Sequence, residues 1–478
     1  MFGFRKRRTQ EGGALSREVR AVFRRGVEAL AAGECRQAVQ CFREVVEAVP
    51  DSPGALCNLA VALSGAGESD QARRAVERAL EIEPHFPEAL VALGGIYSRE
   101  GKIDHAVCQY RKALRMRPDY LEALFELARS YLLAGEYEEA HAWLGRALRR
   151  YPDDPRLHRL IANVYQKIGR VEAAERSYRR TIAIDDTDFV AHYDFGCFQM
   201  ATGDLGGAEE SFRRSISLKG DYAHALNNLS LVLHYQGRHH EAVAEIEKAL
   251  RHYPDYAEAR NNLGKIYYHL ERLDEAEREI REAISLNDTL AGAWHNLAKI
   301  FFCRGEAAEA AMACEKSLEM EPARPEALHD LAMMYMALQR ERDAAEALVK
   351  ALAYDPGLAA ARRKLAEIHL EAGDMESACE HFAIILEAEP DDSAARYNLG
   401  ASLYRMARYE QALDAFRAVL EAEPDHPYAA TSAGLCLELI GRPDEARSLY
   451  LQAIERSPDE EWTDKARERL RHIDRGLC

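Results

Sequence analysis

Residues 87–120 read PEALVALGGIYSREGKIDHAVCQYRKALRMRPDY, and this arrangement of residue types recurs every 34 residues along the chain of 478 residues. The alanine in the second half of the stretch returns at the same interval without a slip in register, at Ala38, Ala72, Ala106, Ala140, Ala174, Ala208, Ala242, Ala276, Ala310, Ala344, Ala378, Ala412 and Ala446. A fixed period of this size is typical of one supersecondary unit copied end to end. The sequence therefore predicts one elongated repeat array rather than about three globular domains.

The period divides the chain into thirteen repeats without an insertion. These are residues 19–52, 53–86, 87–120, 121–154, 155–188, 189–222, 223–256, 257–290, 291–324, 325–358, 359–392, 393–426 and 427–460. The stretch before them, 1–18, is expected to be a basic, disordered tail. The stretch after them, 461–478, is expected to be a capping helix with an apolar stripe at Trp462, Ala466, Leu470 and Ile473.

The apolar pattern of each repeat predicts two amphipathic helices joined by a turn. In residues 87–120 the first half has such residues at i, i+3, i+4 and i+7, which are Leu90, Leu93, Gly94 and Tyr97. The second half has them at i, i+4 and i+7, which are Ala106, Tyr110 and Ala113. Glycine marks the turn in ten repeats, at Gly33, Gly67, Gly101, Gly135, Gly169, Gly203, Gly237, Gly305, Gly373 and Gly441. Proline ends ten repeats, for example at Pro118, because it cannot continue a helix.

The eighth residue of every repeat is Gly, Ala or Ser, as at Gly94 and Ala128. Paired small side chains allow two helices to approach closely. We therefore expect this residue to face the recurring alanine of the second helix, with larger side chains packed around the contact.

The spacing of a leucine, a small residue and an aromatic, followed by alanine, an aromatic and a closing proline, resembles the tetratricopeptide repeat family. The family's tryptophan in the first helix remains only as Trp294. The resemblance implies an all-α fold, a right-handed α-solenoid of antiparallel helix pairs whose first helices line a concave groove. It also implies binding of a peptide or a partner helix in that groove.

Composition limits the classes of partner. The net charge of −17 comes from interspersed charges, which argues against nucleic acid as a partner because a phosphate backbone calls for clustered Lys and Arg. No apolar run is long enough to cross a bilayer. The ten cysteines form no C-x-x-C pair and read as free thiols, which predicts a reducing compartment such as the cytoplasm.

The N-terminal tail leaves one further possibility open. Arg5, Lys6, Arg7 and Arg8 lie beside two phenylalanines, and no apolar segment of a secretory signal follows them. A solvated tail is expected, and weak, reversible contact with an anionic membrane surface is the alternative.

Amide side chains recur on the predicted groove. The sixth residue of a repeat is Asn or Asp at Asn58, Asp194, Asn228, Asn262, Asn296, Asp330 and Asn398. Asparagine both donates and accepts hydrogen bonds, so such a ladder could hold the backbone of an extended ligand. The pattern is similar to the asparagine ladder in the repeat domain of O-linked N-acetylglucosamine transferases, and their catalytic domain has no counterpart here.

Repeats 6 to 10 contain the densest set of polar and aromatic residues at groove positions. The set comprises Tyr193, Asp194, Asn227, Asn228, His234, Tyr235, Asn261, Asn262, Lys265, Tyr268, His295, Asn296, Lys299, Phe302, His329 and Asp330. Aromatic and amide side chains suit an extended peptide, with anchors for its side chains and amides for its backbone. The sequence therefore predicts a peptide groove along these repeats.

Sharper functions lack support in the sequence. Arg159 and Asn163 begin the pattern of the family's carboxylate clamp, but Asp194 stands where the next asparagine is needed. The histidines bring no further ligand at helical spacing, and no nucleophile or phosphate-binding motif stands out, so we expect no metal site, no cofactor and no enzyme activity. The prediction is a protein-binding adaptor; a self-associating scaffold and a noncatalytic regulatory subunit of a separate enzyme are the alternatives.

Overall fold

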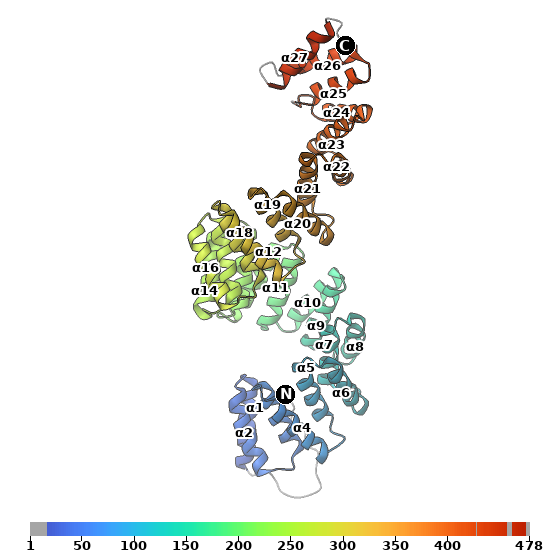
Figure 1. Cartoon of the computed structure of the whole chain (residues 1–478). Coiled ribbons are helices and arrows are strands. Elements are labelled where there is room, and N and C mark those ends of the chain that lie inside the picture. The colour runs from blue at the N-terminus through green and yellow to red at the C-terminus, as the bar shows by residue number, and fades with distance from the viewer. Residues whose placement is uncertain (1–16, 427, 457–460, 475–478) are drawn as a thin grey trace. The chain divides into compact units, whose positions relative to one another are not determined.

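The computed structural model describes residues 17–426, 428–456 and 461–474, without the side chains of residues 461 and 462. The chain divides into two compact units, which we call unit 1 (Met1–Arg238) and unit 2 (His239–Cys478) and describe separately. Each of them contains several of the 34-residue repeats. All regular secondary structure in the described residues is helical, and the predicted all-α repeat fold is confirmed (Figure 1). The predicted N-terminal tail falls almost wholly outside the described residues.

Unit 1 contains six complete helix pairs and the first helix of a seventh. The helices are α1 (Arg17–Ala31), α2 (Cys35–Ala48), α3 (Pro53–Gly65), α4 (Ser69–Ile82), α5 (Pro87–Arg99), α6 (Ile103–Met116), α7 (Leu121–Leu133), α8 (Tyr137–Arg150), α9 (Pro155–Lys167), α10 (Val171–Ile184), α11 (Phe189–Ala201), α12 (Leu205–Leu218) and α13 (Ala223–Tyr235).

Unit 2 continues the alternation and ends in an additional helix. Its helices are α14 (His239–His252), α15 (Ala257–His269), α16 (Leu273–Leu286), α17 (Ala291–Cys303), α18 (Ala307–Met320), α19 (Pro325–Ala337), α20 (Glu341–Tyr354), α21 (Ala359–Ala372), α22 (Met375–Ala388), α23 (Ser393–Arg405), α24 (Tyr409–Ala422), α25 (Ala429–Leu439), α26 (Pro443–Arg456) and α27 (Glu461–Asp474). We call the odd-numbered helices α1–α25 first helices and the even-numbered ones second helices.

Turns between the two helices of a pair are left-handed at one residue. All ten predicted turn glycines have positive φ, between 74° and 84°. Glycine reaches this conformation without a steric penalty, which explains its recurrence. Three pairs make the same turn with another residue, Glu271, Gln339 and Ala407, at φ of 58° or 59°.

The small residue of the first helix lies against a bulky side chain of the second helix. A Cβ atom on Gly94 would lie 2.5 Å from Cε1 of Tyr110, and one on Gly196 would lie 2.8 Å from Cε1 of Phe212. The bulky residue one turn after the recurring alanine thus lies nearest to the small residue in these pairs, a contact that was not predicted. The small residue makes room for that ring. At Gly264, a Cβ atom would also lie 3.0 Å from the carbonyl oxygen of Ala276, one of the recurring alanines.

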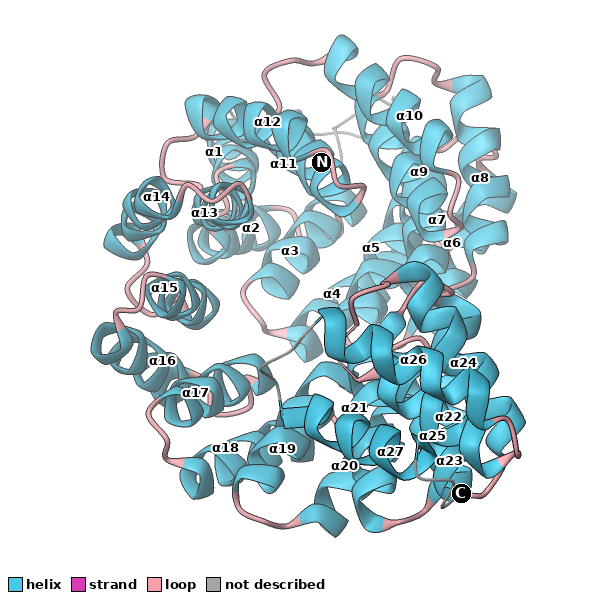
Figure 2. Ribbon diagram, turned by 90° about the horizontal axis from the view of Figure 1, so that it is seen from above, coloured by secondary structure: helices cyan, strands magenta, loops and turns pink. Residues whose placement is uncertain are grey.

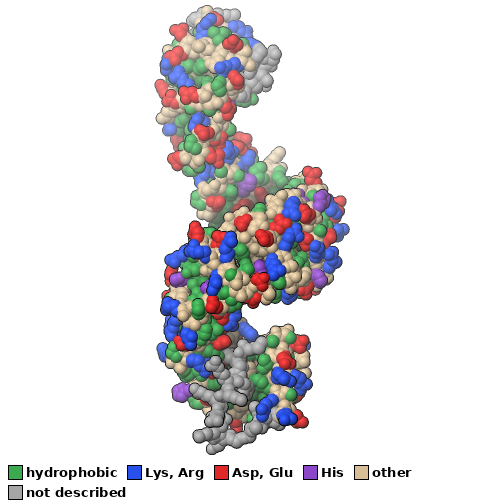
Figure 3. Space-filling model, turned by 180° about the vertical axis from the view of Figure 1, so that it is seen from behind, with side chains coloured by type: hydrophobic (Ala, Val, Ile, Leu, Met, Phe, Trp, Pro, Cys, Tyr) green, Lys and Arg blue, Asp and Glu red, His purple; other side chains and the backbone are tan. Residues whose placement is uncertain are grey.

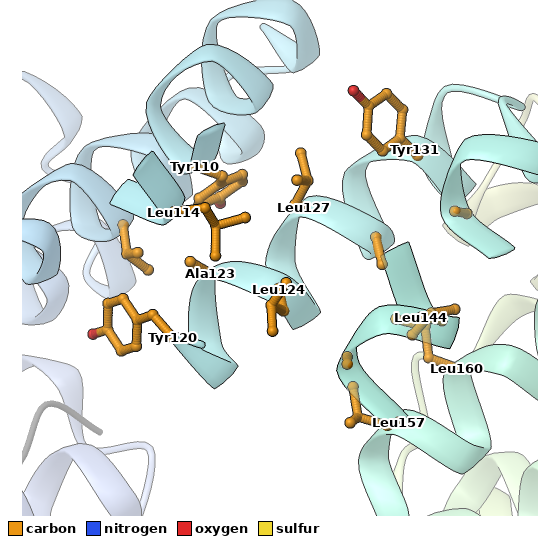
Figure 4. Packing of buried hydrophobic residues seen from close by; sticks show 14 of the residues in the cluster. Tyr110, Leu114, Tyr120, Ala123, Leu124, Leu127, Tyr131, Leu144, Leu157 and Leu160 are labelled. Atoms are coloured by element: carbon orange, nitrogen blue, oxygen red, sulfur yellow. The ribbon is translucent and has the colours of Figure 1, made fainter. Parts of the chain in front are cut away.

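Neighbouring repeats share a continuous apolar core. Figure 4 shows one region of it, where Tyr110 and Leu114 of α6 lie next to Leu124 and Leu127 of α7. All four side chains are buried. Each repeat thus buries its apolar face against the next, as a repeat array requires.

First helices of successive repeats also contact one another, as α5 does with α7 and α15 does with α17. In unit 2, α15 and α17 lie on the inner side of the curve and α14, α16 and α18 lie outside them (Figure 2). At the C-terminal end, α27 packs on α25 and α26 and buries Ala466 completely, while Leu470 and Ile473 are half-buried. The side chain of Trp462, the remaining residue of the predicted stripe, lies outside the described part.

Candidate functional site

The candidate site is the inner face, which we define as residues 2, 5, 6, 9, 12 and 13 of each repeat, all on first helices. Unit 1 contributes α11 and α13, with Tyr193, Asp194, Asn227, Asn228, His234 and Tyr235. Unit 2 contributes α15, α17 and α19, with Asn261, Asn262, Lys265, Tyr268, His295, Asn296, Lys299, Phe302, His329 and Asp330. The predicted set therefore falls into two parts.

Side chains 35 residues apart bond to each other across successive first helices. The fifth residue of one repeat meets the sixth residue of the next in hydrogen-bonded pairs that include Tyr193–Asn228 at 3.3 Å, Asn261–Asn296 at 2.9 Å, His295–Asp330 at 2.9 Å and Tyr397–Ser432 at 3.4 Å. Asn228 and Asn296 of the predicted ladder thus brace neighbouring repeats.

Asn58 differs from the rest of the ladder. Its Nδ2 atom donates to the carbonyl oxygen of Gly54 in its own helix at 2.8 Å, and its side chain is buried. This amide supports α3 locally.

An arginine of unit 1 is held between two carboxylates. Arg159 on α9 lies 3.2 Å from Oδ2 of Asp188 and 3.6 Å from Oδ2 of Asp194. Burial raises the pKa of Asp194 to about 6, with the nearby charge of Arg159 opposing the rise. Arg159 is therefore neutralised within the protein, which agrees with the expected failure of the carboxylate clamp.

Tyr193 packs in an aromatic group. Its ring centroid lies 5.2 Å from that of Tyr222 and 5.8 Å from that of Phe212, and both distances suit favourable ring contacts. Asn227, by contrast, is buried and donates to Oδ1 of Asn228 at 3.2 Å, whereas Tyr235 is 53% exposed. Asn227 thus lies within the wall of unit 1, and Tyr235 lies on its surface.

Asp330 is the polar centre of the part in unit 2. Its carboxylate lies 2.9 Å from Nε2 of His295, 3.3 Å from Nδ1 of His329 and 3.5 Å from Nζ of Lys299. Burial disfavours its charge, but the two histidine hydrogen bonds and the lysine outweigh burial and hold the pKa of Asp330 well below its usual range. His295 is itself buried, so it positions Asp330 more than it presents a surface.

Two residues that were not predicted complete the unit 2 part. The Sγ atom of Cys303 lies 3.2 Å from the hydroxyl oxygen of Tyr268, and this hydrogen bond together with burial raises the pKa of Tyr268 to about 12. His269 stacks on His239 with a centroid distance of 6.3 Å and an angle of 13° between the rings. Tyr268 and Cys303 are again 35 residues apart, and that spacing could have identified the pair from the sequence.

Two other kinds of site are missing from the part of the chain that the structure describes. No group of three or more His, Cys, Asp or Glu side chains there could hold a metal ion. No helix among the described residues is long and apolar enough to cross a membrane.

Comparison with known proteins agrees with the repeat geometry. A tetratricopeptide repeat family model matches residues 29–93, 97–164, 233–300 and 339–403, more than half of the chain. The chain belongs to the tetratricopeptide repeat family. A second tetratricopeptide repeat model matches residues 397–461, and residues 158–263 match the middle TPR-like domain of cilia and flagella-associated protein 70.

A search of curated proteins found no significant match to this tetratricopeptide repeat chain. Among solved structures, a chain of the APC/C hetero-tetramer Cut9-Hcn1 is similar, with 14% sequence identity, a TM-score of 0.44 and alignment over 96% of each chain.

Proposed function

We propose that this tetratricopeptide repeat protein is a noncatalytic interaction scaffold, which binds an extended peptide or a partner helix on the inner face of repeats 6 to 10. The observation that carries the proposal is the set of half-buried polar and aromatic side chains on α15, α17 and α19. Their bonds from one first helix to the next, such as Asn261 to Asn296, hold them in fixed positions. A face that is fixed before binding loses less conformational entropy when a ligand docks.

Site-specific crosslinking in the native cell tests this function. Tyr268 or Phe302 is replaced by a photoreactive phenylalanine derivative, which keeps an aromatic ring at the inner face. The matched controls carry the same group at Met312 and Val349, which are exposed on the second helices α18 and α20. We expect both inner positions to capture one protein, and the crosslinks to map to one short segment of it. Capture of that protein equally well from Met312 and Val349, or from these two sites alone, contradicts the proposal.

A second candidate function is self-association through the second helices. Large apolar side chains are exposed on three consecutive second helices of unit 2, at Met312 on α18, Val349 on α20 and Ile384 on α22. Exposed apolar groups of this kind favour a protein interface. Sedimentation velocity tests the candidate: the sedimentation coefficient should rise with concentration, and substitution of Met312 and Val349 by glutamate should abolish the rise. A monomer at every concentration excludes it.

A further inference from the structure

Charges in unit 2 are divided unequally between first and second helices. The second helices are acidic, with five acidic and two basic residues on α16, and three and one on α18. The first helices α15 and α17 have the opposite balance, with one acidic and two basic residues on α15, and one lysine and no carboxylate on α17, whereas α19 has two acidic residues and no Lys or Arg. In a chain of net charge −17, these two first helices are locally basic. Acidic and basic side chains are interspersed over the face drawn in Figure 3.

The positive groups of α15 and α17 converge. Lys265 and Lys299 occupy the same position of consecutive repeats, so they lie side by side on neighbouring first helices. His269, on the same helix as Lys265, stacks on His239. Burial, followed by the charges of Lys265, His239 and Lys299, lowers the pKa of His269. The lowered pKa favours the uncharged form of His269, so the positive charge of this part of the inner face comes from Lys265 and Lys299.

The carboxylate of Asp330 lies next to Lys299, one of these two lysines. The surrounding histidines and Lys299 stabilise its charge enough to overcome the cost of burial. Next to these groups lie Tyr268 and Phe302, half-buried at equivalent positions of their repeats. Carboxylate-binding groups and large apolar side chains thus alternate from one inner-face position to the next.

We propose that the inner face of α15 and α17 binds an acidic peptide segment in which carboxylates alternate with large apolar side chains. The carboxylates approach Lys265 and Lys299, and the apolar side chains pack on Tyr268 and Phe302. A nucleic acid fits less well, because a phosphate backbone calls for clustered Lys and Arg, and the two lysines alternate with aromatic side chains. The inference rests on the proposed function and specifies the chemistry of its partner.

Fluorescence anisotropy with the full chain tests the inference. The probe is a labelled peptide of about 12 residues that alternates glutamate with leucine or phenylalanine, which spans several first helices at about 3.3 Å per residue. A matched peptide has glutamine in place of every glutamate. We expect the acidic peptide to bind at least about tenfold more tightly, and added salt to reduce this difference as charges are screened.

Three variants locate the binding. Lys299→Glu and the milder double variant Lys265→Gln with Lys299→Gln should each weaken binding of the acidic peptide at least about tenfold, because both reduce the attraction for carboxylates. Lys350→Glu changes the net charge as much as Lys299→Glu does, but at an exposed site of the second helix α20, and should bind like the unsubstituted protein. Circular dichroism confirms that each variant remains helical.

Several outcomes overturn the inference. These are equal binding of the acidic and glutamine peptides, equal loss of affinity in Lys350→Glu, and no binding of the acidic peptide at low salt. Lysine-dependent binding of anionic lipid vesicles or of RNA, without binding of the acidic peptide, also overturns it. If the crosslinks from Tyr268 and Phe302 persist in any of these cases, the inference fails while the proposed scaffold function stands.

Discussion

The Nε2 atom of His295 lies 2.9 Å from Oδ2 of Asp330, across the two successive first helices α17 and α19. His295 is buried, so the carboxylate gives a polar ring atom a partner that water cannot supply. The same carboxylate holds His329 and Lys299. This one side chain therefore connects α17 with α19 and sets the charge of the inner face between them.

We expect Asp330→Asn to destabilise these two helices by about 1–3 kcal/mol at pH 7, since charged hydrogen bonds are lost. Because the folded pKa of Asp330 is depressed, its stabilising contribution is present above its unfolded pKa of about 3.9 and is lost as pH falls through the lower folded pKa. The deficit of the variant should therefore shrink in strong acid. Hydrogen exchange of α17 and α19 at pH 7 and thermal unfolding at pH 7 and below 4 measure it. Asp414→Asn, at an exposed site of α24, is the control. Equal protection in both variants would contradict a bracing role.

Adjacent glycines on α5 should respond in opposite ways to alanine. A Cβ at Gly94 would lie 2.5 Å from Cε1 of Tyr110, whereas at Gly95 the nearest such atom is the Tyr110 hydroxyl oxygen at 4.0 Å. Gly94→Ala should lower the free energy of unfolding by about 1–3 kcal/mol through overpacking. Gly95→Ala should raise it by about 0.5–1 kcal/mol, because alanine favours the helix. Urea unfolding of both variants checks the difference, and a loss of similar size at both sites would refute the assigned contact.

The partner of Gly94 can be tested directly by a compensating change. Ala128 and the buried Leu144 occupy the equivalent positions in the next repeat, so Gly94→Ala combined with Tyr110→Leu reproduces a combination that the chain already contains. The double variant should recover at least about half of the stability lost in Gly94→Ala. Additive losses in the double-mutant cycle would show that the two residues are not coupled.

Periodicity predicted the helix pairs because spacing along the chain fixes which residues share a face of one helix. The positions of the turns followed from the ten glycines for the same local reason. Spacing does not determine which side chain of a second helix comes nearest to a given residue of the first, so the contact of Gly94 with Tyr110 was not predicted. The burial of Asn227 and His295 also depends on side-chain direction and on the neighbouring repeat, and polarity alone placed both on a surface.

Three repeats make their turn without glycine, and the strain this causes is measurable. Ala407 has a φ of 58°, a conformation that costs a residue with a Cβ about 1–2 kcal/mol. Ala407→Gly should therefore stabilise the chain by up to about 1 kcal/mol after the greater flexibility of the unfolded glycine is counted. Ala401→Gly, inside α23, should lower the stability by a similar amount. Thermal unfolding compares them, and a lower melting temperature for Ala407→Gly would show that the turn is not strained.

The raised pKa of Asp194 predicts a stability that depends on pH with the opposite sign to that of Asp330. Because burial raises its folded pKa to about 6, above an unfolded value of about 3.9, the stability that Asp194 contributes is present below pH 4 and is lost as pH rises through 6. Asp194→Asn should remove this loss and make the chain about 1–3 kcal/mol more stable than the unsubstituted protein at pH 8. Arg159 retains Asp188 as a partner, so the variant leaves no unpaired charge. Melting temperatures measured from pH 4 to pH 8 should converge at the acid end, diverge between pH 4 and pH 6, and stay apart above pH 6. Glu210→Gln on the exposed side of α12 should follow the unsubstituted protein throughout, and an Asp194→Asn curve parallel to both would contradict the assigned burial effect.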